Sequence, residues 1–130
     1  MIDIEKLRRA MRDIAAKKGQ FTLFALFRRE DGPDGWDLVV SAPWLEKGKL
    51  KALGEFSEQL KASVGEKQLR EISRIATINQ DDPALSATLS AIHVEDGVEE
   101  VRDSVFFGLR IEHAIFLRAK PLAETQIRAS

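Results

Sequence analysis

The sequence contains no cysteine. This absence excludes disulfide bonds, thiolate nucleophiles and cysteine-ligated zinc sites. It is also typical of proteins in a reducing compartment, so we expect a cytoplasmic location. Histidine is scarce as well, because the chain has only 2. A histidine-dependent catalytic triad or metal site would therefore have to use His93 or His113.

The chain also lacks an excess of charge of either sign. Its 20 basic and 21 acidic side chains leave a formal net charge of −1, so no overall positive field attracts nucleic acid. Nucleic-acid binding through Arg28, Arg29 and nearby lysines is therefore the least favoured function. No apolar run approaches the roughly 20 residues of a membrane span, and we expect no hydrophobic signal segment at the N-terminus. We predict no membrane association.

Motifs of the common enzyme classes are missing too. The sequence has no glycine-rich phosphate loop ending in GK[ST], no GxGxxG motif and no HExxH motif. It also has no GxSxG nucleophile elbow. We therefore predict no cofactor, no bound metal and no catalytic residues, which favours a binding protein over an enzyme.

What the sequence does have is enough apolar material for one folded domain. A chain of 130 residues that is 44% apolar fits a single domain, and it can bury roughly two thirds of its unfolded surface. We place the domain at residues 1–120 and a C-terminal tail at residues 121–130, because Pro121 ends the last predicted strand.

The spacing of apolar side chains predicts secondary structure of both kinds. Helices are predicted at residues 4–18, 45–64 and 83–93. Strands are predicted within residues 20–29, 36–42, 73–79, 98–102 and 109–119. Asp3 and Asp82 are suited to cap the first and third helices. The order α-β-β-α-β-α-β-β predicts an α+β fold, with a mostly antiparallel sheet of about five strands and three helices packed on it.

His113 lies in the most strand-like segment of the chain. Alternation along that strand places His113 on one face with Ile111 and Ile115, and places Glu112 and Arg118 on the other face. A histidine among aliphatic side chains needs a hydrogen-bond partner. Two interpretations stay open: a packed, hydrogen-bonded histidine, or a ligand contact in the wall of a pocket.

A pocket near His113, Arg110 and Trp44 is the basis of one function hypothesis. Trp44 follows Pro43 at a predicted junction between a strand and a helix, and such junctions often border pockets in sheet proteins. On this hypothesis the chain is a small-molecule-binding protein or a small enzyme, with these three residues in contact with the ligand.

The segment RDSVFFG, residues 102–108, is the basis of the leading hypothesis. Alternation cannot bury three consecutive bulky side chains on one face of a strand. Either the following glycine permits a bulge, or an aromatic ring stays partly exposed. Exposed Phe106 and Phe107 beside Arg102 and Asp103 would resemble an interface core with a polar rim. We therefore expect a non-enzymatic module that binds another protein or forms a homodimer.

The acidic run from Glu95 to Asp103 allows one more interpretation. It has five carboxylates in nine residues, and magnesium and calcium prefer oxygen ligands of this kind. The spacing of a calcium-binding loop is absent. We interpret the run as a solvated edge strand that charge protects against aggregation.

Overall fold

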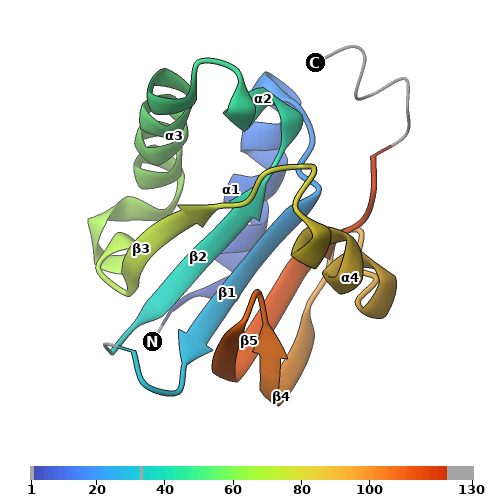
Figure 1. The fold of residues 1–130 in the computed structure, drawn as a ribbon. Helices are drawn as coiled ribbons and strands as arrows, with labels where there is room; N and C mark the ends of the chain where they lie inside the picture. Colours follow the sequence, from blue (N-terminus) through green and yellow to red (C-terminus); the bar gives the residue numbers. More distant parts are fainter. Residues whose placement is uncertain (1, 33, 123–130) are drawn as a thin grey trace.

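The computed structural model describes residues 2–32 and 34–122. In this part of the chain the elements are α1 (Ile4–Lys18), β1 (Leu23–Arg29), β2 (Trp36–Ser41), α2 (Pro43–Glu46), α3 (Lys49–Leu69), β3 (Ile72–Thr77), α4 (Pro83–Ala91), β4 (Glu99–Phe106) and β5 (Leu109–Ala119). The predicted α+β fold is confirmed (Figure 1). The described part has four helices rather than three, because the short α2 is separate from α3. Most of the predicted tail, residues 123–130, lies outside the described residues.

The five strands form one sheet in the order β3-β2-β1-β5-β4 (Figure 1). The pairs β1–β2, β1–β5 and β4–β5 are antiparallel. The pair β2–β3 is parallel, so the sheet is mixed. The chain returns from β2 to β3 through α2 and α3, which is the long crossover that a parallel pair requires.

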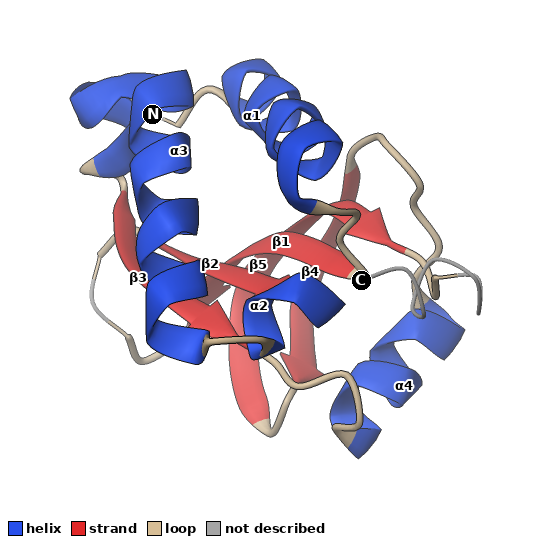
Figure 2. Cartoon of the chain, turned by 90° about the horizontal axis from the view of Figure 1, so that it is seen from above, coloured by secondary structure: helices blue, strands red, loops and turns tan. Residues whose placement is uncertain are grey.

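The two faces of the sheet are covered by different helices. Figure 2 shows α1 and α3 on one face and α4 toward the other. The central strand β1 is apolar on both faces for this reason. Phe24 and Leu26 pack on the side of α1 and α3, whereas Leu23, Ala25 and Phe27 pack on the side of α4. The predicted central position of this strand is confirmed.

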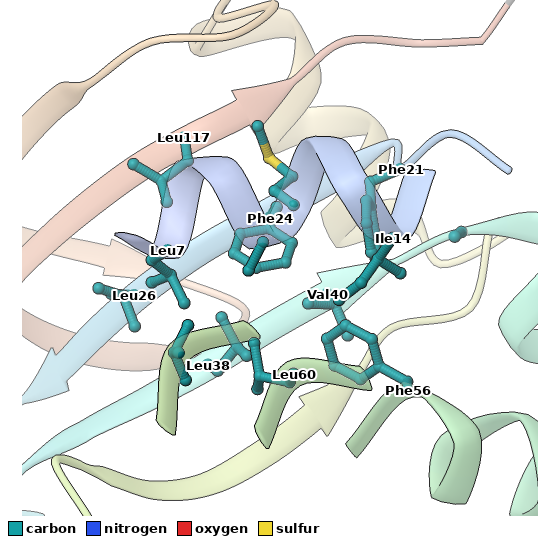
Figure 3. Packing of buried hydrophobic residues seen from close by; sticks show 14 of the residues in the cluster. Leu7, Ile14, Phe21, Phe24, Leu26, Leu38, Val40, Phe56, Leu60 and Leu117 are labelled. Atoms are coloured by element: carbon teal, nitrogen blue, oxygen red, sulfur yellow. The ribbon is translucent and has the colours of Figure 1, made fainter. Parts of the chain in front are cut away.

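The larger core lies between the sheet and the helices α1 and α3. Figure 3 shows its buried side chains, among them Leu7, Ile14, Phe21, Phe24, Leu38, Val40, Phe56 and Leu60. Phe21 meets the rings of Phe24 and Phe56 edge to face, with centroids 5.0 and 5.8 Å apart. Burying one such side chain stabilises the fold by about 1.5–3 kcal/mol. This core therefore holds α1 and α3 against the sheet.

The predicted helix caps are confirmed. A carboxylate oxygen of Asp3 accepts a hydrogen bond from the backbone of Lys6 at 3.1 Å. Asp82 accepts one from the backbone of Ala84 at 2.8 Å. These bonds satisfy backbone donors that a helix leaves unpaired at its start.

The prediction of strict alternation along β5 is wrong at two places. The pairing of β5 with β1 passes over Leu117 and over Glu112, so each is the extra residue of a bulge. Each bulge reverses the alternation of the side chains beyond it. Ile111 consequently belongs to the cluster on the α4 side, whereas Ile115 belongs to the cluster under α1 and α3.

No helix in the described part of the chain combines the length and the apolar character that crossing a membrane demands.

Candidate functional site

His113 is packed between neighbouring strands. Its Nε2 atom lies 2.7 Å from an oxygen of Glu100 in β4, and its side chain is 14% exposed. Its ring meets the ring of Trp36 edge to face, with centroids 5.2 Å apart. The guanidinium of Arg28, which pairs with His113 across the strands, lies 4.4 Å from the centroid of Trp36. His113 therefore has the hydrogen-bond partner that a packed histidine needs.

Trp44 lies at the other end of the sheet. Its Nε1 donates to the backbone carbonyl of Gly19 at 2.9 Å, and its ring contacts Phe21, just before the start of β1. His113 instead pairs with Arg28, near the end of β1. The length of β1 thus separates Trp44 from His113.

Arg110 lies at the solvent-exposed end of β5. Its side chain is 78% exposed, and its guanidinium is 3.8 Å from a carboxylate oxygen of Glu30. The structure therefore does not bring Arg110, His113 and Trp44 together around one pocket.

The proposed interface segment forms the end of the β4–β5 hairpin. Phe106 is buried inside its own chain, where its ring lies 5.5 Å from Phe27 and 5.2 Å from Phe116 between centroids. Phe107 is partly buried and, like Gly108, has a positive φ, 54° and 75° respectively. Positive φ at both central residues is typical of a two-residue type I′ hairpin turn. The alternation is therefore not broken by a bulge at Gly108.

Three other residues of this segment are at the surface. Arg102 and Asp103 are exposed, and Asp103 has a φ of 50° within an edge strand. Val105 is the exposed bulky side chain of the segment, at 62%. The acidic run thus lies partly on the edge strand β4, as predicted.

A pocket of about 560 Å³ lies beside α1 and is lined by other residues. Its wall on α1 includes Met11, Ala15 and Ala16, and its polar groups include Glu95 and Arg118. The loop that carries Glu95 is held against the end of β5, because Val94 and Ala119 exchange backbone hydrogen bonds of 3.1 and 2.7 Å. The pocket is therefore built from segments far apart in the sequence.

Arg118 is a buried cation in this pocket. The residue is 5% exposed, and it donates from Nε to the carbonyl of Phe21 at 2.6 Å and from Nη1 to the carbonyl of Glu95 at 3.0 Å. Among the described residues, no carboxylate oxygen lies within 4.0 Å of the Arg118 guanidinium. Burial lowers the pKa of Arg118, and the nearby charges of Glu95 and Asp96 partly offset that effect.

The acidic groups near Arg118 are paired with other cations. Asp96 accepts from Arg12 at 2.6 Å and from Arg8 at 3.3 Å. Glu95 lies 3.3 Å from the ammonium of Lys120. The pKa of Arg8 is raised, chiefly by its hydrogen bond with Glu5 and further by Asp96. Arg118 thus borders the pocket with carbonyl partners, while the carboxylates beside it are held by other side chains.

Sequence reasoning missed Arg118 for a definite reason. Regular alternation predicts that it lies on the face of β5 opposite to His113, with Arg110 and Lys120. The bulge at Leu117 turns it instead toward α1. The available signal was a single arginine between Leu117 and Ala119, since arginine is rarely buried without a partner.

The described residues contain no group of three or more histidine, cysteine, aspartate or glutamate side chains arranged to hold a metal ion. No family model, curated protein or solved structure matches this chain. Its function therefore has to be argued from its own geometry.

Proposed function

We propose that this chain is a non-enzymatic, cytoplasmic binding protein that takes a small molecule in the Arg118 pocket. The small-molecule hypothesis from the sequence is thus kept, but the proposed site is the Arg118 pocket and not a pocket near His113, Arg110 and Trp44. The observation that carries it is the buried guanidinium of Arg118 at the wall of a pocket of about 560 Å³. Ligand pockets usually measure about 300–1,000 Å³ and combine apolar walls with a few placed polar groups.

The side chains of the pocket favour binding over catalysis. A nucleophile needs a general base within hydrogen-bond reach, and the carboxylates at this pocket are in ion pairs with Arg8, Arg12 and Lys120. Because these carboxylates are held in ion pairs, the pocket is suited to orienting a ligand and not to activating a nucleophile. The cytoplasmic location is supported by the cysteine-free sequence.

The experiment is a small-molecule screen on the full chain by two-dimensional NMR of backbone amides. Binders should shift the amide signals of Ala15, Ala16 and Glu95. Ala16→Phe places a ring in the pocket from an exposed helix position and should abolish those shifts. Ala87→Phe, at an exposed position of α4, is the matched control. A screen without any binder at this pocket would contradict the proposal.

Self-association or protein binding through the β4–β5 hairpin is the second candidate function. Its support is Val105, a bulky apolar side chain that is 62% exposed on the edge strand β4. The outer edge of such a strand can pair with another chain, and a symmetric dimer is the commonest assembly.

Light scattering at micromolar concentration tests this candidate. It should give a mass near twice the monomer, and Val105→Glu should halve it. Val98→Glu is the matched control, because Val98 is 49% exposed and precedes the opposite end of β4. Phe106→Glu is unsuitable, since Phe106 is buried in its own chain. A monomer at every concentration would exclude self-association.

A further inference from the structure

We infer that the ligand of the Arg118 pocket is a monocarboxylate with a short apolar body. This inference rests on the proposed small-molecule function and names the chemical class of the ligand. Three features of the pocket carry it: its charge balance, its remaining hydrogen-bond donors and its apolar wall.

The charge balance leaves room for one negative charge. The carboxylates that line the pocket belong to two separate sets of ion pairs: Asp96 pairs with Arg8 and Arg12, and Glu95 pairs with Lys120. Arg8 also pairs with Glu5. The bonds of Arg118 to described residues go to backbone carbonyls instead. Both sets of pairs are neutral, so Arg118 leaves a net charge of +1. A monoanion neutralises this charge. A doubly charged phosphate would leave an excess negative charge beside Glu95 and Asp96, which is unfavourable in a partly buried site.

The remaining donors suit a carboxylate. The bonds that described residues make to Arg118 use Nε and Nη1, which leaves Nη2 to donate to a ligand. Gln20 also lines the pocket. Its carbonyl oxygen accepts from the backbone of Phe21 at 3.1 Å, so its amide NH₂ group is the end that can donate. Bonds from a guanidinium to a carboxylate are charge-assisted and are roughly twice as strong as neutral ones.

The apolar wall sets the character of the rest of the ligand. Met11, Ala15 and Ala16 lie on one side of the pocket, on consecutive turns of α1. Alanines at two of these positions leave space that longer side chains would fill. An aromatic ring or a short alkyl chain attached to the carboxylate would bury its apolar surface there.

Benzoate, benzamide, phenyl phosphate and inorganic phosphate are the probes for the test. Benzamide has nearly the shape of benzoate without its charge. In NMR titrations of the full chain, benzoate should shift the Nε–H signal of Arg118 and the amides of Ala15 and Ala16 in a saturable way. Benzamide and phenyl phosphate should both bind at least about tenfold more weakly than benzoate. Benzamide has no charge to pair with the arginine, and phenyl phosphate carries a second negative charge beside the carboxylates. Inorganic phosphate should give no saturable shift.

Three variants locate the binding. Arg118→Gln removes the charge, and Arg118→Lys keeps it; benzoate affinity should be lost in the first and partly retained in the second. Arg118 also anchors Phe21 and Glu95, so either change can disturb folding. Ala16→Phe leaves Arg118 in place and should block benzoate, whereas Ala87→Phe should not.

The outcomes separate the two proposals. Benzamide binding as tightly as benzoate at the same signals would overturn the carboxylate inference and support a small-molecule site. Tighter binding of phenyl phosphate than of benzoate would also overturn the carboxylate inference and support a small-molecule site. Benzoate binding that survives Ala16→Phe would overturn the placement in this pocket. No shift by any probe would overturn the inference and count against the proposed function, which the wider screen then decides.

Discussion

His113 shows how a single side chain can connect strands without lining a pocket. It bonds Glu100 of β4 at 2.7 Å and lies against the ring of Trp36 in β2. The strands β2 and β4 are not adjacent in the sheet, so the imidazole joins elements on both sides of β1 and β5. The hydrogen bond and the ring contact of His113 therefore stabilise the packing of the strands at this position.

We therefore expect His113→Ala to lower the free energy of unfolding by about 1–3 kcal/mol, since it removes a hydrogen bond and a mostly buried ring. Urea denaturation measures the change. A double-mutant cycle with Glu100→Ala should show coupling, because the two side chains contact each other. Glu112→Ala, at an exposed neighbouring position, is the control. An unchanged stability together with loss of a ligand or partner would assign His113 to a functional site.

At the scale of elements, the loop between β1 and β2 depends on one glycine. Gly35 has a φ of 105°, and a Cβ atom there would lie 2.6 Å from Oγ of Ser73 and 3.1 Å from the carbonyl oxygen of Glu71. The loop therefore packs directly against the start of β3, and the close approach needs a residue without a side chain.

Gly35→Ala should accordingly destabilise the protein by about 1–3 kcal/mol. Gly54→Ala is the matched substitution, because Gly54 lies within α3 and a Cβ atom there meets nothing within 4 Å. It should stabilise the protein by about 0.5–1 kcal/mol through helix propensity. Denaturant midpoints of the two variants test both signs. Equal effects would contradict the close approach at Gly35.

The contact between α1 and α3 should depend on pH. Lys18 donates to a carboxylate oxygen of Glu55 at 2.6 Å, which lowers the pKa of Glu55 from its usual 4.5. Since the pKa is lower in the folded state, the stabilisation is complete above about pH 4.5 and is lost as the pH falls through the folded-state pKa.

The difference in stability between the natural chain and Glu55→Gln should therefore be present at pH 7 and disappear in acid. Because the pair is partly exposed, the effect should also shrink in high salt. Denaturation at several pH values measures it, with Glu58→Gln on the same helix as the control. A difference that does not change with pH would exclude the ion pair as its cause.

The elements differ in how well the sequence predicts them. α1 and α4 follow from local signals, an apolar stripe and the caps Asp3 and Asp82. The parallel pairing of β3 with β2 depends on where the long crossover places β3 in the sheet. The spacing of apolar residues along the sequence does not indicate that position. The bulges at Glu112 and Leu117 depend on the register between β5 and β1. Because the bulge at Leu117 decides which face Arg118 occupies, the candidate pocket could not be predicted from the alternation.

At the scale of the whole molecule, the fold positions its pocket through long-range contacts. α1 supplies the apolar wall, the end of β5 supplies Arg118, and the segment before β4 supplies Glu95. The ion pairs from Arg8 and Arg12 to Asp96 join the first of these segments to the last. The same contacts that close the fold around α1 thus build the proposed binding site.

The two apolar clusters on either side of the sheet are expected to hold the fold without a metal ion. Both clusters include side chains of the central strand β1, so they should unfold together in one cooperative transition. A structural zinc ion contributes about 10 kcal/mol or more, which is comparable to the entire stability of a typical domain. Thermal unfolding should therefore give the same melting temperature with and without EDTA. Addition of zinc after EDTA treatment is the control, and a large drop with EDTA that zinc reverses would show that the fold requires a metal.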